Sequence, residues 1–84
     1  YLQSHGRSSE DLLSCIERTV HAHGGWTTSR RGSTRLQLNS NKQTFVLDVL
    51  QDSAHSFSIL VHGSTIQREF PMKIWEDVTI VWDH

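Results

Sequence analysis

The sequence predicts an α+β domain in which an N-terminal helix packs on an antiparallel sheet of three to four strands, followed by a C-terminal helix. An apolar stripe with helical spacing comes first in the chain and indicates the first helix. Period-two alternation of apolar residues then predicts three strands, Thr34–Asn39, Gln43–Gln51 and Ser56–His62. The short, turn-forming connections between these runs force neighbouring strands to be antiparallel. A chain of 84 residues is long enough for one domain, which we place at residues 8–84.

The first helix is expected over residues 9–23. Ser8 is positioned to cap it, and Asp11 lies three residues further on, as a capping box requires. Gly24-Gly25 supplies the backbone freedom that ends a helix. The apolar side chains expected to form the core are Leu12, Ile16 and Val20 from the helix and Phe45, Leu47, Val49, Phe57, Ile59 and Val61 from the strands.

The segment between the helix and the first strand leaves two alternatives open. Trp26 is expected to plug the end of the helix–sheet interface. The polar stretch Thr27–Ser33 then forms either a loop or a hairpin whose first strand is Trp26–Ser29. Further along the chain, Thr65–Phe70 is a candidate fourth strand.

The end of the chain fits a helix better than a strand. Pro71 suits the first turn of a helix. Ile74 and Val78, with Val81 or Trp82, would then line one helical face. The alternative is a strand over 78–81, where the residues are mostly β-branched.

Residues 1–7 are expected to lie outside the fold. Their Tyr-x-Gln-Ser pattern resembles the remnant of a protease-cleavable tag, or a disordered lead. We therefore expect the chain to be an excised piece of a longer protein.

Composition narrows the function classes. A net charge of −1 argues against a nucleic-acid binder, which needs surplus positive charge to neutralise phosphates. The single cysteine cannot form an internal disulfide, which favours the cytoplasm. No run of about 18 apolar residues is available for a transmembrane helix. The hydrophobic content of 36% is low for a free-standing domain, so a partner surface is expected to contribute.

No motif in the sequence predicts catalysis, a cofactor or a metal site. The six histidines lack zinc-ligand spacing and are expected on the surface. Cys15, beside the apolar stripe, is expected to be buried and inert. Asp48 alternates with the apolar residues of its strand and is expected to be solvated. We therefore expect a non-catalytic protein.

Two sets of residues are candidates for binding. Arg30, Arg31, Arg35 and Lys42 cluster around the first two turns and predict a contact with an anion or an anionic lipid, if they share one face. Trp75 and Trp82 are large enough to anchor a protein partner.

The order of helix, strands and helix resembles the kinase-associated C-terminal domain of the microtubule-affinity-regulating and AMP-activated kinases. Phe45-Val46-Leu47-Asp48-Val49 resembles the central strand of that family, and the run from Phe57 to Ile66 resembles its next strand and the turn before its last helix. This resemblance implies a regulatory domain with a kinase catalytic domain as a partner in cis. A double-stranded RNA-binding domain has the same order of elements but a Lys-rich start to its last helix, where Pro71–Ile74 carries one cation.

The expected function is therefore a regulatory or protein-interaction module of a larger intracellular protein. The alternatives are an anionic-phospholipid-binding module, a domain like those that bind double-stranded RNA, and a small enzyme or toxin-neutralising protein.

Overall fold

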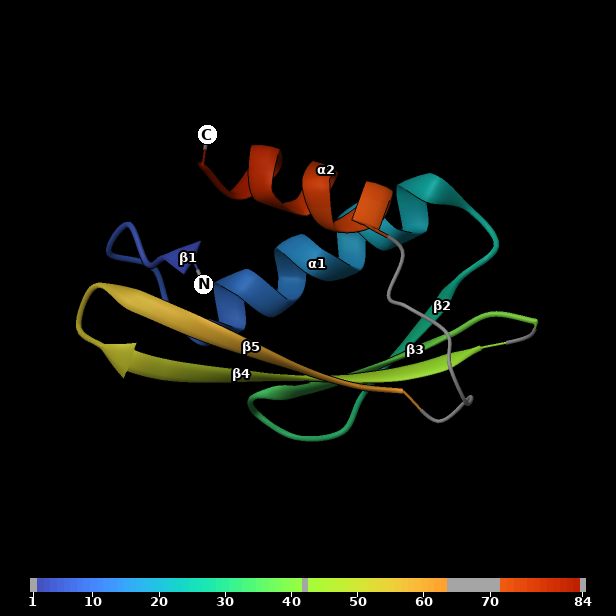
Figure 1. Ribbon diagram of the computed structural model, residues 1–84, viewed down its shortest axis with the longest axis horizontal. Helices are drawn as coiled ribbons and strands as arrows, with labels where there is room; N and C mark the ends of the chain where they lie inside the picture. The colour runs from blue at the N-terminus through green and yellow to red at the C-terminus, as the bar shows by residue number, and fades with distance from the viewer. Residues whose placement is uncertain (1, 42, 64–71, 84) are drawn as a thin grey trace.

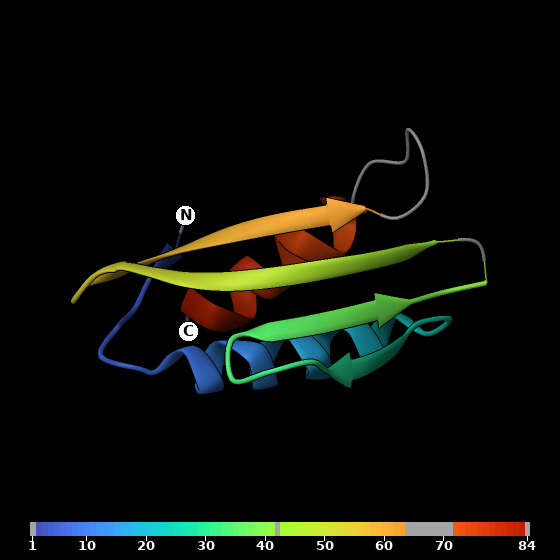
Figure 2. The same cartoon turned by 90° about the horizontal axis from the view of Figure 1, so that it is seen from below.

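The computed structural model describes residues 2–41, 43–63 and 72–83 and confirms the α+β class. The described residues form two helices and one antiparallel sheet with five strands. The elements are β1 (Leu2–Gln3), α1 (Ser9–His23), β2 (Thr27–Arg30), β3 (Arg35–Asn39), β4 (Thr44–Ser53), β5 (Ser56–Gly63) and α2 (Met72–Asp83). Both helices cover the same face of the sheet, and the other face is seen from below (Figures 1 and 2).

The bounds of α1 agree with the sequence prediction because its capping signals act as expected. The Ser8 hydroxyl accepts a hydrogen bond from the Asp11 backbone N–H, and the Asp11 carboxylate accepts one from the Ser8 backbone N–H. The reciprocal bonds satisfy two N–H groups that the helix leaves unpaired. Gly24 adopts a φ of 73°, which ends the helix as glycine permits.

The sheet has the strand order β1-β5-β4-β3-β2, so β2 to β5 form a simple meander. The hairpin alternative for the segment after α1 is correct, because β2 pairs with β3 with Thr28 opposite Leu38. Leu47 lies opposite Leu36 on one side and Val61 on the other. In this register, every second residue along a strand lies on the face of the sheet that the helices cover.

The core contains most of the predicted side chains and several more. Leu12, Ile16, Val20, Phe45, Leu47, Val49 and Phe57 are buried, as expected. Ile59 is partly buried. Val61 is 44% exposed, so the prediction that Val61 belongs to the core is wrong. Leu36 and Leu38 of β3 complete the sheet side of the core. Trp26 packs at its edge, with its ring centroid 6.0 Å from that of Phe45, which confirms its expected position.

The C-terminal segment is a helix from Met72, which decides between the two alternatives left open by the sequence. Ile74, Val78 and Trp82 recur every four residues and are all buried. The two helices run antiparallel side by side (Figure 1), and His23 at the end of α1 lies 2.6 Å from Asp77 of α2. The strand predicted at Thr65–Phe70, and Pro71, lie outside the described residues.

Leu2, Gln3 and Ser4 belong to the fold, contrary to expectation. Leu2 is buried, and β1 pairs with β5, with Leu2 opposite Phe57. The Ser4 backbone N–H donates to the His55 carbonyl. The sequence argument failed here because a two-residue strand is too short to show alternation.

Candidate protein-interaction site

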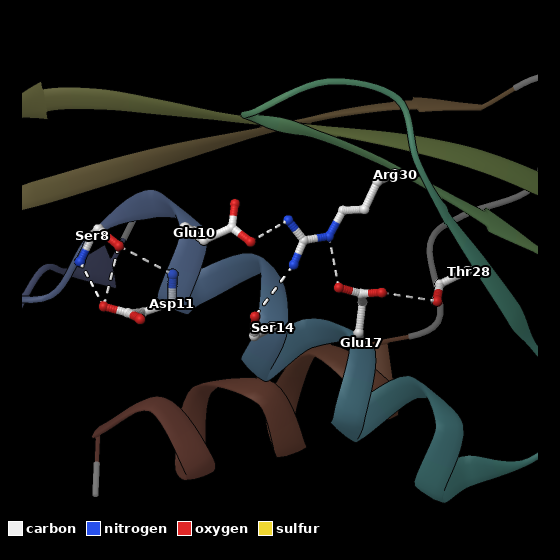
Figure 3. A network of polar contacts seen from close by, with 7 residues as sticks. All are labelled: Ser8, Glu10, Asp11, Ser14, Glu17, Thr28 and Arg30. Atoms are coloured by element: carbon white, nitrogen blue, oxygen red, sulfur yellow. Dashed lines mark hydrogen bonds and ion pairs between the residues drawn. The ribbon is translucent and has the colours of Figure 1, made fainter.

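Arg30, predicted to belong to a basic patch, points towards α1. It lies opposite Leu36 and therefore on the helix-covered face of the sheet. Its guanidinium donates to Glu17 at 2.6 Å, to Glu10 at 2.8 Å and to the Ser14 hydroxyl at 3.2 Å (Figure 3). Desolvation lowers the pKa of Arg30, but the hydrogen bonds to Glu17 and Glu10 outweigh this effect, so the pKa is raised on balance. The charge of Arg30 is thus used to join β2 to α1.

The other predicted cations lie elsewhere. Arg35 is opposite Asp48 on the open face of the sheet and donates to both carboxylate oxygens, at 2.7 and 3.1 Å. Arg31 donates to the Gln37 amide oxygen at 2.6 Å. Lys42 lies outside the described residues. The structure therefore places Arg30 on one face of the sheet and Arg35 on the other.

The two tryptophans predicted to anchor a partner contribute to the interior. Trp82 is 1% exposed, and its indole N–H donates to the Gln3 carbonyl at 2.7 Å. Its ring meets Phe57 edge-on, with centroids 6.3 Å apart. Trp75 is partly buried against the same core. The ring of Trp82 is therefore enclosed within the domain.

The outer face of α2 carries apolar side chains that the fold does not bury. Ile80 is 57% exposed and Val81 is 48% exposed, whereas Ile74, Val78 and Trp82 on the inner face are buried. A surface helix of a globular protein normally pairs one apolar face with a polar one. In α2 the apolar residues extend past that single face.

Two adjoining clefts run along the line where α1 and α2 meet. One, of about 330 Å³, is lined by Thr19, Ala22, His23, Asp77, Ile80 and Val81. The other, of about 300 Å³, is lined by Arg7, Asp11, Ser14, Cys15, Arg18, Val81 and Trp82. Val81 belongs to both, so the clefts adjoin at its side chain. We call these lining residues together the helix seam.

The second cleft of the helix seam contains both of its arginines, Arg7 and Arg18. The Arg7 guanidinium carbon lies 3.9 Å from the centroid of the Trp82 ring, and the same group donates to the Trp82 carbonyl. Arg18 is exposed on α1. Asp11 is engaged in the capping box. Burial raises the pKa of the Cys15 thiol, so this cysteine is held as the neutral thiol and is a poor nucleophile.

The open face of the sheet is largely polar and internally paired. Asp48, expected to be solvated, has a side chain only 13% exposed because Arg35 and His62 cover it. The hydrogen bond from Arg35 holds the pKa of Asp48 below its usual value. Leu50 and Leu60 are the large apolar residues that this face exposes in the described part of the chain. They are diagonal neighbours on β4 and β5.

A polar cleft lies at the end of the β4–β5 hairpin, where Gln3, Ser4, His5, Gly6, Asp52, Ser53, His55 and Ser56 line about 660 Å³. Two of its ionisable groups are already engaged, because His5 lies 3.1 Å from Asp83 and Asp52 accepts from Ser58. Within residues 2–41, 43–63 and 72–83, no three His, Cys, Asp or Glu side chains gather closely enough to hold a metal ion. Neither described helix has the length and apolar character to cross a bilayer.

Searches against protein-family models, curated proteins and solved structures found no match. Sequence reasoning missed the helix seam as a candidate site. The signal for it was present in Ile80 and Val81, which lie off the stripe formed by Ile74, Val78 and Trp82.

Proposed function

We propose that the domain is a non-catalytic interaction module of a larger intracellular protein and that it binds a partner protein through the helix seam. The observation that carries the proposal is the exposure of Ile80 and Val81 on a helix whose inner face is already buried. Apolar surface of this kind gains free energy when a partner removes it from water, at roughly 25 cal/mol per Å². Adjacent exposed apolar groups beside a cleft are one mark of a protein-interaction surface.

A regulatory role within a kinase-like polypeptide is the version that the family resemblance favours. The order of α1, the β2–β5 meander and α2 is the order that this resemblance implies. A catalytic domain in cis would then be the first partner to test. The low hydrophobic content of the chain also supports a role completed by another surface.

The alternatives gain less support from the geometry. Anionic-lipid binding by the turn arginines requires one positively charged face, but Arg30 is bonded to Glu10 and Glu17, and Arg35 to Asp48 on the opposite face. Binding of double-stranded RNA requires several cations at the start of the last helix, where Lys73 is the cation among the described residues. An enzyme built on Cys15 would need a base beside the thiol, and the described lining of its cleft contains no histidine.

The proposal is tested by affinity capture with the wild-type domain and two matched variants. Ile80→Gln/Val81→Gln removes the exposed apolar groups of the helix seam and keeps a helix-forming residue at both positions. Leu60→Thr removes a similarly exposed apolar group from the open sheet face. We expect specific proteins to be recovered by the wild type and by Leu60→Thr but not by Ile80→Gln/Val81→Gln. Circular dichroism confirms that all three are folded.

Sedimentation with phosphatidylserine-containing liposomes at low and high salt is run in parallel. Binding through cations weakens steeply as salt screens the charges, whereas binding through apolar anchors changes little. Salt-sensitive liposome binding that Arg31→Ala reduces, with no protein captured through the helix seam, would contradict the proposal and favour the lipid function.

A further inference from the structure

The helix seam has a shape that suits one kind of occupant. Because α1 and α2 lie antiparallel on the same face of the sheet (Figure 1), their outer surfaces meet along the helix seam, a groove whose two clefts are lined by side chains from both helices. A third helix packs into such a groove at an interaxial distance of 8–10 Å, with its side chains between those of the two walls. The groove has apolar groups from both walls, Ala22 from α1 and Ile80 and Val81 from α2.

The charge of the helix seam changes along its length. At the end of the first cleft, His23 and Asp77 form a pair between the two helices, 2.6 Å apart. The second cleft is lined by two cations, Arg7 and Arg18, and by one carboxylate, that of Asp11. The groove is therefore apolar around Ile80 and carries an excess of positive charge beyond Val81.

Arg7 is held in place before any partner arrives. Its guanidinium carbon lies over the Trp82 ring, 3.9 Å from the centroid, and the guanidinium donates to the Trp82 carbonyl in the last turn of α2. A cation there is also favoured by the negative end of the helix dipole. Ordering Arg7 in the free domain lowers the entropic cost of a later ion pair.

Arg18 is the freer of the two cations. It is exposed, and it lies one helical turn before Ala22, a rise of about 6 Å along α1. An acidic group on a bound helix, placed about one turn from its apolar anchors, would reach Arg18 while those anchors meet Ala22, Ile80 and Val81. Charge complementarity and apolar contact thus act on the same occupant.

From these features we infer that the helix seam binds an acidic amphipathic helix of a partner protein, with its apolar side on Ala22, Ile80 and Val81 and a carboxylate on Arg18. The inference rests on the proposed function and specifies its partner. A membrane surface or a nucleic acid fits less well, because the helix seam as a whole sets two arginines against two aspartates, Asp11 and Asp77, which leaves too little positive charge for a phosphate array.

The test uses the full 84-residue domain and a displayed library of helix-forming peptides. Enriched peptides are synthesised with a fluorophore, and their affinities are measured by anisotropy. We expect apolar residues at i, i+3 or i+4 and an Asp or Glu about one turn away. Arg18→Glu should weaken binding about tenfold, the usual scale of an interface charge pair. Replacing the peptide's acid with Lys should restore affinity for Arg18→Glu.

Arg31→Glu is the matched control, because Arg31 is an exposed arginine away from the helix seam. It should leave the affinity unchanged, whereas Ile80→Gln/Val81→Gln should abolish binding. The inference is overturned if the enriched peptides lack an acidic residue, if Arg31→Glu weakens binding as much as Arg18→Glu, or if the Lys peptide fails to rescue. Enrichment of no helix, together with capture of a partner protein that still depends on Ile80 and Val81, would also overturn it while leaving the proposed function intact.

Discussion

Arg30 and Arg35 belong to the same hairpin but lie on opposite faces of the sheet. Arg30 is opposite Leu36 and bonds to Glu17 of α1, whereas Arg35 is opposite Asp48 on the open face. A basic cluster in the sequence is therefore divided into a bond between β2 and α1 and a cross-strand pair on the sheet. Neither arrangement leaves the full charge of the hairpin available to one ligand.

Removing Arg30 should destabilise the domain more than removing Arg31. Arg30→Ala deletes three hydrogen bonds between β2 and α1 and leaves Glu10 and Glu17 without their shared cation. Because these groups are partly exposed, we expect a loss of only about 1 kcal/mol in the free energy of unfolding. Arg31→Ala deletes the bond to Gln37 and should change stability little. Urea denaturation of the two variants measures the difference, and equal midpoints would show that the network does not hold β2.

The Asp48 pair should make stability depend on acid. The hydrogen bond from Arg35 lowers the pKa of Asp48 in the folded state below its usual value of 3.8. Between these two pKa values the unfolded chain binds more protons, so stability falls as the pH falls. The stabilisation from the Asp48–Arg35 pair is complete above the usual pKa of Asp48. It is lost as the pH drops through the lowered pKa of Asp48 in the folded state. Asp48→Asn should therefore show a shallower loss of stability in acid, measured as the urea midpoint from about pH 6 to pH 2. Parallel curves for the two proteins would count against the pairing.

Trp82→Ala should unfold much of the population, because the ring is enclosed by the core. Large-to-small replacement of a buried aromatic residue costs about 3–5 kcal/mol, and the indole N–H also loses its bond to the Gln3 carbonyl. Thermal denaturation followed by circular dichroism measures the loss. A well-folded Trp82→Ala domain that fails to bind its partner would instead assign Trp82 to the interface.

Leu2→Ala tests whether the start of the chain belongs to the fold. Leu2 is 6% exposed and lies opposite Phe57. Its truncation should cost about 2 kcal/mol, the lower end for a buried leucine, since the site is at the edge of the sheet and can relax. Gln3→Ala is the control, because its side chain is exposed and its carbonyl is retained. The same urea midpoint for both variants would place Leu2 outside the cooperative unit.

Local signals in the sequence were sufficient for the two helices, for strands β3 to β5 and for most of the core. The Ser8–Asp11 capping box and the four-residue spacing in α1 act within one helix, so no tertiary contact is needed to predict them. The alternation in β4 and β5 likewise identifies the residues that face the helices. Val61 follows this pattern but remains 44% exposed among the described residues, because position on the core face does not ensure that a helix lies over it.

The site depends on relations between distant residues, which the sequence does not show. The partners of Arg30 are thirteen to twenty positions away in the chain. The Gln3 carbonyl accepts from Trp82, which lies 79 positions further along the chain. An exposed tryptophan and a buried one look identical in a sequence. The apolar pair Ile80-Val81 was visible, but only the packing of α2 on α1 shows which of its neighbours are already buried.

The central claim is that the outer surface of the helix pair, rather than the open face of the sheet, contacts the partner. Amide chemical-shift mapping tests it most directly, with isotope-labelled domain titrated with the partner or with an enriched helical peptide. The account predicts that the perturbed amides lie at Arg18, Ala22, Ile80 and Val81, with those of Gln37, Val46 and Leu60 unchanged. Perturbations confined to Gln37, Val46 and Leu60 would contradict it and assign binding to the open face of the sheet.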